Sequence, residues 1–111
     1  YPLWMGDMPA LLKAWIEQVF RPGFAFDDPQ KGLPEKLLRG RSARIVVTMG
    51  MPGWFYRLFY RAHSVRSFRR NVLRFTGIRP VRLSLIGLVE GSAGHRQRWL
   101  DRMQRLGEKA R

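Results

Sequence analysis

The order of apolar and polar positions along the chain predicts an amphipathic helix near its beginning. Apolar side chains recur every three or four residues over residues 8–20, which is the spacing of one helix face. They are Met8, Leu11, Leu12, Trp15, Ile16, Val19 and Phe20. Asp7 is expected to cap this helix, and Pro9 to lie near its first position, where a missing amide costs little. We expect the apolar stripe, Trp15 included, to face the core.

Two runs, separated by a helical pattern, predict strands. Residues 43–49 form a β-branched run with a single charge, which is typical of a strand buried on both faces, and residues 81–86 predict another strand. Between the strands, residues 54–60 are rich in aromatic side chains and predict either a helical turn or a packed loop. Residues 68–75 predict a helix that Gly77 ends.

The remaining segments predict a long loop and a last helix. Residues 24–42 contain the turn signals Asp27-Asp28-Pro29 and Lys31-Gly32, and so predict a loop. A final helix carries its apolar side chains on one face. They are Trp99, Leu100, Met103 and Leu106.

Helices that alternate with strands predict an α/β fold with a parallel sheet covered on both faces. Two strands alone leave unpaired edges and give the helices little to pack on. We therefore expect residues 1–111 to be the C-terminal portion of one domain, whose first strands lie before Tyr1.

Composition narrows the classes of function. The chain has 111 residues, 45% of them hydrophobic, and no cysteine, which excludes disulfides and thiolate metal sites and fits the cytoplasm. No apolar run is long enough for a transmembrane segment, and we expect no metal site.

The net charge of +13 is concentrated after residue 38, where 17 basic residues face three acidic ones. Such a field attracts polyanions. However, the sequence has no helix-turn-helix spacing, aromatic RNA-binding signature or zinc ligands, so a solvated arginine-rich surface is favoured over a specific nucleic-acid site.

Three motifs in fixed order resemble one family. Residues 1–26 hold an aromatic-Pro-Leu start, then Pro-Ala-Leu-Leu-Lys, then Gly-Phe-Ala-Phe. Residues 45–50 read Ile-Val-Val-Thr-Met-Gly and precede Tyr56, and residues 75–78 read Phe-Thr-Gly-Ile. Together these motifs resemble the flavodoxin-like NAD(P)H:quinone reductases along almost the whole chain.

The resemblance implies a three-layer flavodoxin-like fold that binds FMN or FAD. Ligands in such folds lie beyond the carboxyl ends of the strands. The resemblance assigns cofactor binding to Pro2, Leu3, Trp4, Met5, Thr48, Met49 and Gly50. It makes Tyr56 the candidate catalytic donor of a proton or hydrogen bond. The phosphate-binding loop that follows the first strand in this family is missing from these residues.

The implied activity is hydride transfer from NAD(P)H through the flavin to a quinone-like acceptor, in a homodimer. Three other functions stay open at this stage. They are a flavodoxin-like regulatory subunit of a potassium-efflux system, a basic nucleic-acid-binding module, and a structural piece without activity.

Overall fold

A computed structural model describes residues 1–27 and 32–111 of the chain. The turn signals at Asp28, Pro29 and Lys31 lie outside the described residues. The elements are α1 (Ala10–Val19), β1 (Ala43–Thr48), α2 (Gly53–Leu58), α3 (His63–Ser67), the π-helix η1 (Phe68–Arg74), β2 (Val81–Ile86) and α4 (Ala93–Glu108).

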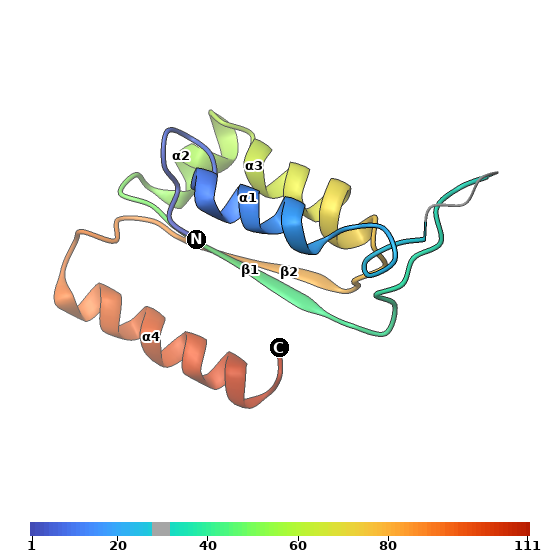
Figure 1. The fold of residues 1–111 in the computed structure, drawn as a ribbon. Helices are drawn as coiled ribbons and strands as arrows, with labels where there is room; N and C mark the ends of the chain where they lie inside the picture. Colours follow the sequence, from blue (N-terminus) through green and yellow to red (C-terminus); the bar gives the residue numbers. More distant parts are fainter. Residues whose placement is uncertain (28–31) are drawn as a thin grey trace.

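The strands form a parallel sheet between two layers of helices. β1 pairs with β2 in parallel, with Ala43 opposite Val81 and Thr48 opposite Ile86. Figure 1 shows α1, α2, α3 and η1 on one face of the sheet and α4 on the other. The expected α/β fold with a parallel sheet is confirmed.

The start of the chain extends the sheet along the free edge of β1. The amide of Leu3 donates to the Thr48 carbonyl at 2.8 Å, and the amide of Thr48 donates to the Tyr1 carbonyl at 3.0 Å. Pro2 and Thr48 therefore form a parallel bridge. Residues 1–3 thus end beside β1, and they run in the same direction.

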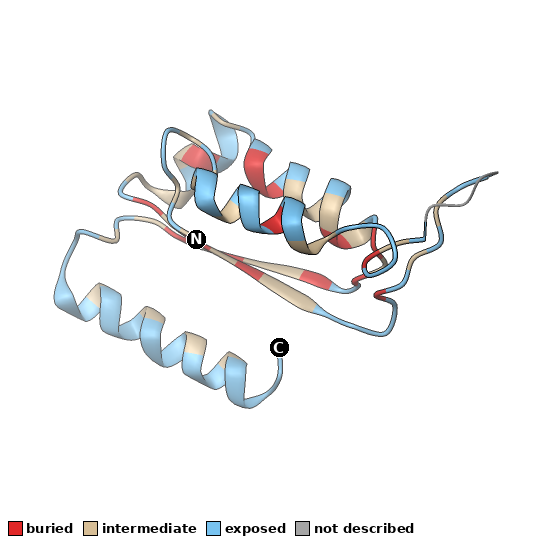
Figure 2. Ribbon diagram, in the orientation of Figure 1, coloured by how far each residue is buried: buried red, intermediate tan, exposed pale blue. Residues whose placement is uncertain are grey.

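The core lies between the sheet and the larger helical layer, as the buried segments in Figure 2 show. Ile45 and Val47 of β1 point into this core, together with Leu73 of η1. The expected burial of β1 on both faces is wrong, because Arg44 and Val46 are only half-buried. α4 covers their side of the sheet, and none of its residues is buried.

The first helix departs from the sequence prediction in its cap and in its apolar face. It begins at Ala10, so Pro9 takes the cap position and Asp7 does not cap it. Instead, Asp7 Oδ1 accepts a hydrogen bond from the Met8 amide at 2.7 Å. Ile16 is buried, whereas Leu11 is 83% exposed and Trp15 54% exposed. The sheet is covered by a narrower stripe of the helix than its apolar spacing predicts.

The contrast between Leu73 and Leu11 generates a stability prediction. Leu73→Ala removes a side chain that is 5% exposed, and we expect the cavity to lower the free energy of unfolding by about 3 kcal/mol. Leu11→Ala, at an exposed helix position, is the matched control and changes it by less than about 0.5 kcal/mol. Denaturant titration measures both variants. Equal losses would contradict the placement of the core.

Candidate functional site

Three parallel segments end together at the carboxyl-end edge of the sheet, where the strands run out. Residues 1–3 and β2 flank β1, and the amide of Met49 continues the ladder by donating to the Ile86 carbonyl at 2.9 Å. The loops that follow the three segments therefore start side by side. In open parallel sheets this is the edge at which ligands bind.

A tight turn follows residues 1–3 and carries an exposed indole. Trp4 and Asp7 exchange two backbone hydrogen bonds of 2.8 and 2.9 Å. The two residues between them have positive φ, +50° at Met5 and +79° at Gly6. This conformation costs little at Gly6 because glycine has no Cβ. The turn leaves the Trp4 side chain 62% exposed at the edge of the sheet.

The loop after β1 offers free backbone donors. Within the part of the chain that the structure describes, the amides of Gly50 and Met51 make no hydrogen bond. A Cβ placed on Gly50 would meet no atom within 4 Å. The loop therefore carries two unpaired N–H groups, and the space next to the Gly50 Cα is open. A planar ligand with acceptor atoms along one edge matches such donors.

Tyr56 lies beneath this site and is fully buried. Its hydroxyl is 2.6 Å from Ser64 Oγ, which in turn is 3.2 Å from the Tyr1 hydroxyl. Burial raises the pKa of the Tyr1 phenol to about 12, and its hydrogen bond to Ser64 opposes this shift. The three hydroxyl groups form a hydrogen-bonded chain that links the start of the chain to α2 and α3.

Aromatic rings lie between this buried chain and the turn at residues 4–7. The rings of Tyr60 and His63 are stacked with centroids 6.0 Å apart, and the Tyr60 ring centroid is 6.1 Å from that of Tyr56. A Cβ on Gly6 would come within 3.1 Å of Tyr60 Cε1. Because the turn at residues 4–7 rests on these rings, it is held from below.

Gly87 supports the loop after β1 from the end of β2. A Cβ at Gly87 would lie 2.4 Å from the Gly53 nitrogen and 2.8 Å from the Met51 carbonyl oxygen. Both contacts are with backbone atoms, which cannot rotate away. Only glycine permits this approach, and the loop with the free amides depends on it.

The structure brings together most of the residues expected to bind the cofactor, but it does not bring all their side chains to one surface. The exposed ones are Pro2, Trp4, Met5 and Gly50. Leu3 and Thr48 are half-buried, and the Met49 side chain is buried. The role of Tyr56 as a donor stays a prediction, since its hydroxyl is bonded to Ser64.

Sequence reasoning missed Ser64, Tyr60 and Gly87. A serine inside a short polar stretch carries no local signal of its burial. Gly87 did carry one, because a glycine directly after a strand marks close backbone approach. Among the described residues there is no group of three or more His, Asp or Glu side chains that could hold a metal ion.

Comparison with known proteins gives this arrangement a family. The profile of the flavodoxin-like fold family matches residues 1–109. The chain belongs to this family. The expected flavodoxin-like fold is therefore confirmed, and so is the resemblance to its quinone reductases.

Relatives in this family are named as quinone oxidoreductases. The FMN-dependent NADH:quinone oxidoreductase 1 of Bradyrhizobium diazoefficiens is 33% identical over 94 residues, which cover 83% of this chain and 44% of that protein. The human ribosyldihydronicotinamide dehydrogenase [quinone] is 43% identical over 51 residues, covering 45% of this chain and 21% of that protein.

A solved structure of the same fold aligns with the entire chain. The NAD(P)H:quinone oxidoreductase from Methanothermobacter marburgensis superposes with a TM-score of 0.81 at 27% identity, covering 100% of this chain and 56% of that one. The chain thus spans about half the length of this solved structure, and less than half the length of the two relatives named above.

Among the described residues of the chain, no helix is both long enough and apolar enough to cross a bilayer.

The contact at Gly87 generates a prediction. Gly87→Ala forces a methyl group against the backbone of residues 51–53, and we expect it to lower the free energy of unfolding by roughly 1–3 kcal/mol. Gly107→Ala is the matched control, because a Cβ there meets nothing within 4 Å and alanine favours a helix. Thermal unfolding compares the two variants. An equally harmless Gly87→Ala would contradict the close approach.

The buried phenol of Tyr1 generates a pH prediction. Its pKa rises from 10.0 to about 12 in the folded protein, so the neutral phenol stabilises the fold fully below pH 10. This contribution is lost as the pH rises from 10 to about 12, because only the unfolded chain ionises there. Tyr1→Phe should remove it. Unfolding free energies measured across this range test the point, and an unchanged slope in Tyr1→Phe would refute it.

Proposed function

We propose that this chain forms the ring-binding wall for FMN in an oxidoreductase that passes electrons from a nicotinamide nucleotide to a quinone. The observation that carries the proposal is that the exposed Trp4 and the unpaired amides of Gly50 and Met51 follow two paired segments, residues 1–3 and β1, at the carboxyl end of a flavodoxin-like sheet. The relatives named as FMN-dependent NADH:quinone oxidoreductases support the choice of cofactor, donor and acceptor.

The residues present fit the ring end of FMN. An isoalloxazine ring is flat and apolar with acceptor atoms along its pyrimidine edge, so it needs a platform and N–H donors. Trp4 offers the platform, and the loop at residues 50–51 offers the donors, with open space next to Gly50. We assign only this ring end, and not the phosphate, to these residues.

When bound, FMN supplies two-electron redox chemistry that no side chain of the protein can perform. The chain's own part is to bind and orient. The amides of Gly50 and Met51 would donate hydrogen bonds to acceptor atoms of the ring, and their loop would need no reorganisation because Gly87 supports it. Tyr56 and Ser64 hold the rings of Tyr60 and His63 in place under Gly6. The burial of Tyr56 favours this supporting role.

We propose a second copy of the protein as the partner at this end of the molecule. Trp54, Leu58 and Phe59 of the α2 region are 66%, 70% and 70% exposed. Exposed apolar side chains gathered in this way are typical of an interface. The expected homodimer would cover them, and sedimentation of the purified protein tests it. A cytoplasmic location also stays a prediction.

The function is tested with the protein expressed from its full reading frame. We expect it to bind FMN, to lose the flavin absorbance bands when NADH is added, and to recover them with a quinone. Trp4→Ala removes the platform and should weaken FMN binding about two- to tenfold, which is the range for one aromatic contact.

Trp15→Ala is the matched control, because this indole lies on α1 in an edge contact with Phe20, away from the turn at residues 4–7. We expect it to bind FMN like the unchanged protein. A colourless protein that ignores added FMN would refute the proposed function. Equal losses in both tryptophan variants would refute the assigned platform.

A further inference from the structure

A groove lined by arginines adjoins the rings of Tyr60 and His63 at the candidate site. It has a volume of about 670 Å³, and five arginines line it. They are Arg61, Arg66, Arg69, Arg70 and Arg74, and we call this the arginine groove. Tyr60 and His63, which support the turn at residues 4–7, form its near end.

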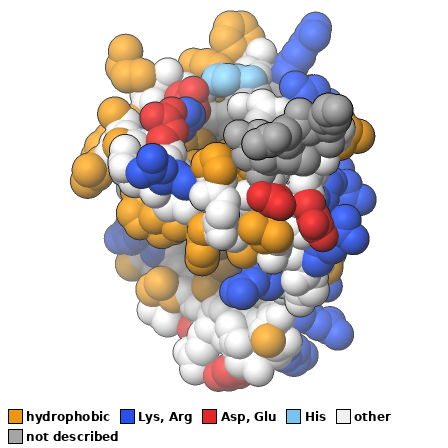
Figure 3. All heavy atoms as spheres, turned by 45° about the vertical axis from the view of Figure 1, so that its right-hand side comes forward, with side chains coloured by type: hydrophobic (Ala, Val, Ile, Leu, Met, Phe, Trp, Pro, Cys, Tyr) orange, Lys and Arg blue, Asp and Glu red, His pale blue; other side chains and the backbone are white. Residues whose placement is uncertain are grey.

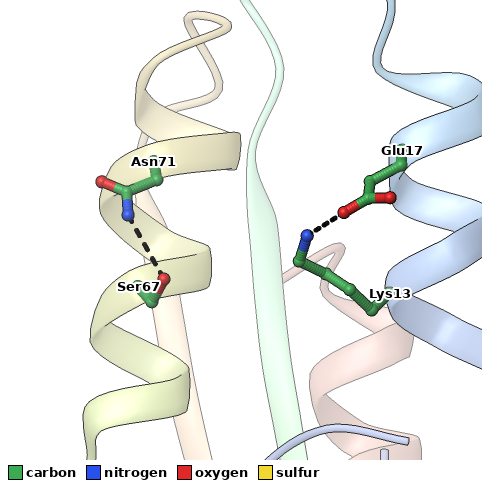
Figure 4. Close-up of polar contacts among 4 residues, drawn as sticks. All are labelled: Lys13, Glu17, Ser67 and Asn71. Atoms are coloured by element: carbon green, nitrogen blue, oxygen red, sulfur yellow. Dashed lines mark hydrogen bonds and ion pairs between the residues drawn. The ribbon is translucent and has the colours of Figure 1, made fainter. Parts of the chain in front are cut away.

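The arginine groove gathers positive charge on helices that carry no acidic residue. The sequence contains no Asp or Glu between Glu35 and Glu90, so its own helices supply no carboxylate. On the neighbouring α1, Lys13 forms an ion pair with Glu17. Figure 4 shows this pair facing η1, where the Asn71 amide donates to Ser67 Oγ at 3.2 Å. Glu17 is therefore already paired with a lysine.

Gathering like charges without counter-ions costs free energy that an anion would recover. Arg69 and Arg74 are half-buried, and their Nε atoms are buried without a hydrogen-bond partner among the described residues. Figure 3 shows that Lys and Arg side chains gather along one flank of the surface in that view. Guanidinium groups bind phosphate in a bidentate manner, which makes phosphate the anion they match best.

We propose that the arginine groove binds the phosphate groups of the nicotinamide nucleotide donor and selects a donor with an additional ribose phosphate, as in NADPH. This inference rests on the proposed function, because it places the donor beside the ring site. A monoester phosphate adds nearly two negative charges to the dinucleotide. A concave groove that ends at stacked rings matches a single nucleotide better than it matches the extended surface of a nucleic-acid duplex.

The test measures binding of adenosine 2′,5′-bisphosphate and adenosine 5′-monophosphate by calorimetry at a fixed ionic strength. The protein is again the product of the full reading frame. We expect the bisphosphate to bind at least about tenfold more tightly, as charge-assisted hydrogen bonds to one more phosphate imply. The double variant Arg66→Glu with Arg70→Glu should abolish this preference. Both residues are exposed, so the fold should survive the change.

The matched control is Arg21→Glu with Arg105→Glu, two exposed arginines outside the groove. It changes the net charge by the same amount and should keep the preference. In steady-state assays kcat/KM for NADPH should fall about tenfold more than kcat/KM for NADH in the groove variant, because only NADPH loses the contact of the additional phosphate. Its FMN absorbance spectrum should be unchanged.

Three results would overturn the inference. The first is equal binding of the two nucleotides by the unchanged protein. The second is the same loss of affinity in both charge-reversal variants, which would reveal a general field effect. The third is a groove variant that loses only a steeply salt-dependent binding of duplex DNA, which would make the groove a polyanion surface. Nucleotide binding is measured without reference to flavin, so a protein that binds no FMN fails the proposed function separately.

Discussion

Thr48 forms backbone hydrogen bonds with Tyr1 and Leu3, and this pairing determines where the first turn of the chain can lie. The neighbouring residue, Met49, is bonded to Ile86 on the other side of the strand. Parallel pairing on both sides of β1 makes three segments end at the same edge. Without it, Trp4 and the amides of residues 50–51 would have no fixed relation to one another.

The layers around this edge keep it in shape by contacts of different kinds. Beneath the turn at residues 4–7, rings pack on rings, and the buried hydroxyl of Ser64 joins Tyr56 to Tyr1. Behind the loop after β1, Gly87 lets two backbone segments touch. Outside these contacts the surface becomes strongly basic. A buried interior thus borders a groove lined by arginines, which suits a ligand with a flat ring at one end and phosphate at the other.

Sequence reasoning succeeded where a residue's role follows from its neighbours along the chain. The apolar runs predicted both strands, and the ordered motifs predicted the flavodoxin-like fold. The role of the two loops at the candidate site stays a prediction. Sequence reasoning failed where a role depends on distant segments. Which face of α1 meets the sheet, and hence that Leu11 and Trp15 are exposed, depends on packing that spacing alone does not specify. The burial of Tyr56 depends in the same way on Ser64 and Tyr1.

The central claim is that the carboxyl ends of residues 1–3, β1 and β2 form one wall of a flavin site. A crystal structure of the full-length protein with FMN tests it most directly. The account predicts the isoalloxazine ring against Trp4, with its pyrimidine edge within hydrogen-bond distance of the Gly50 or Met51 amide. A ring bound elsewhere on the molecule, or at this edge but facing away from both loops, would contradict it.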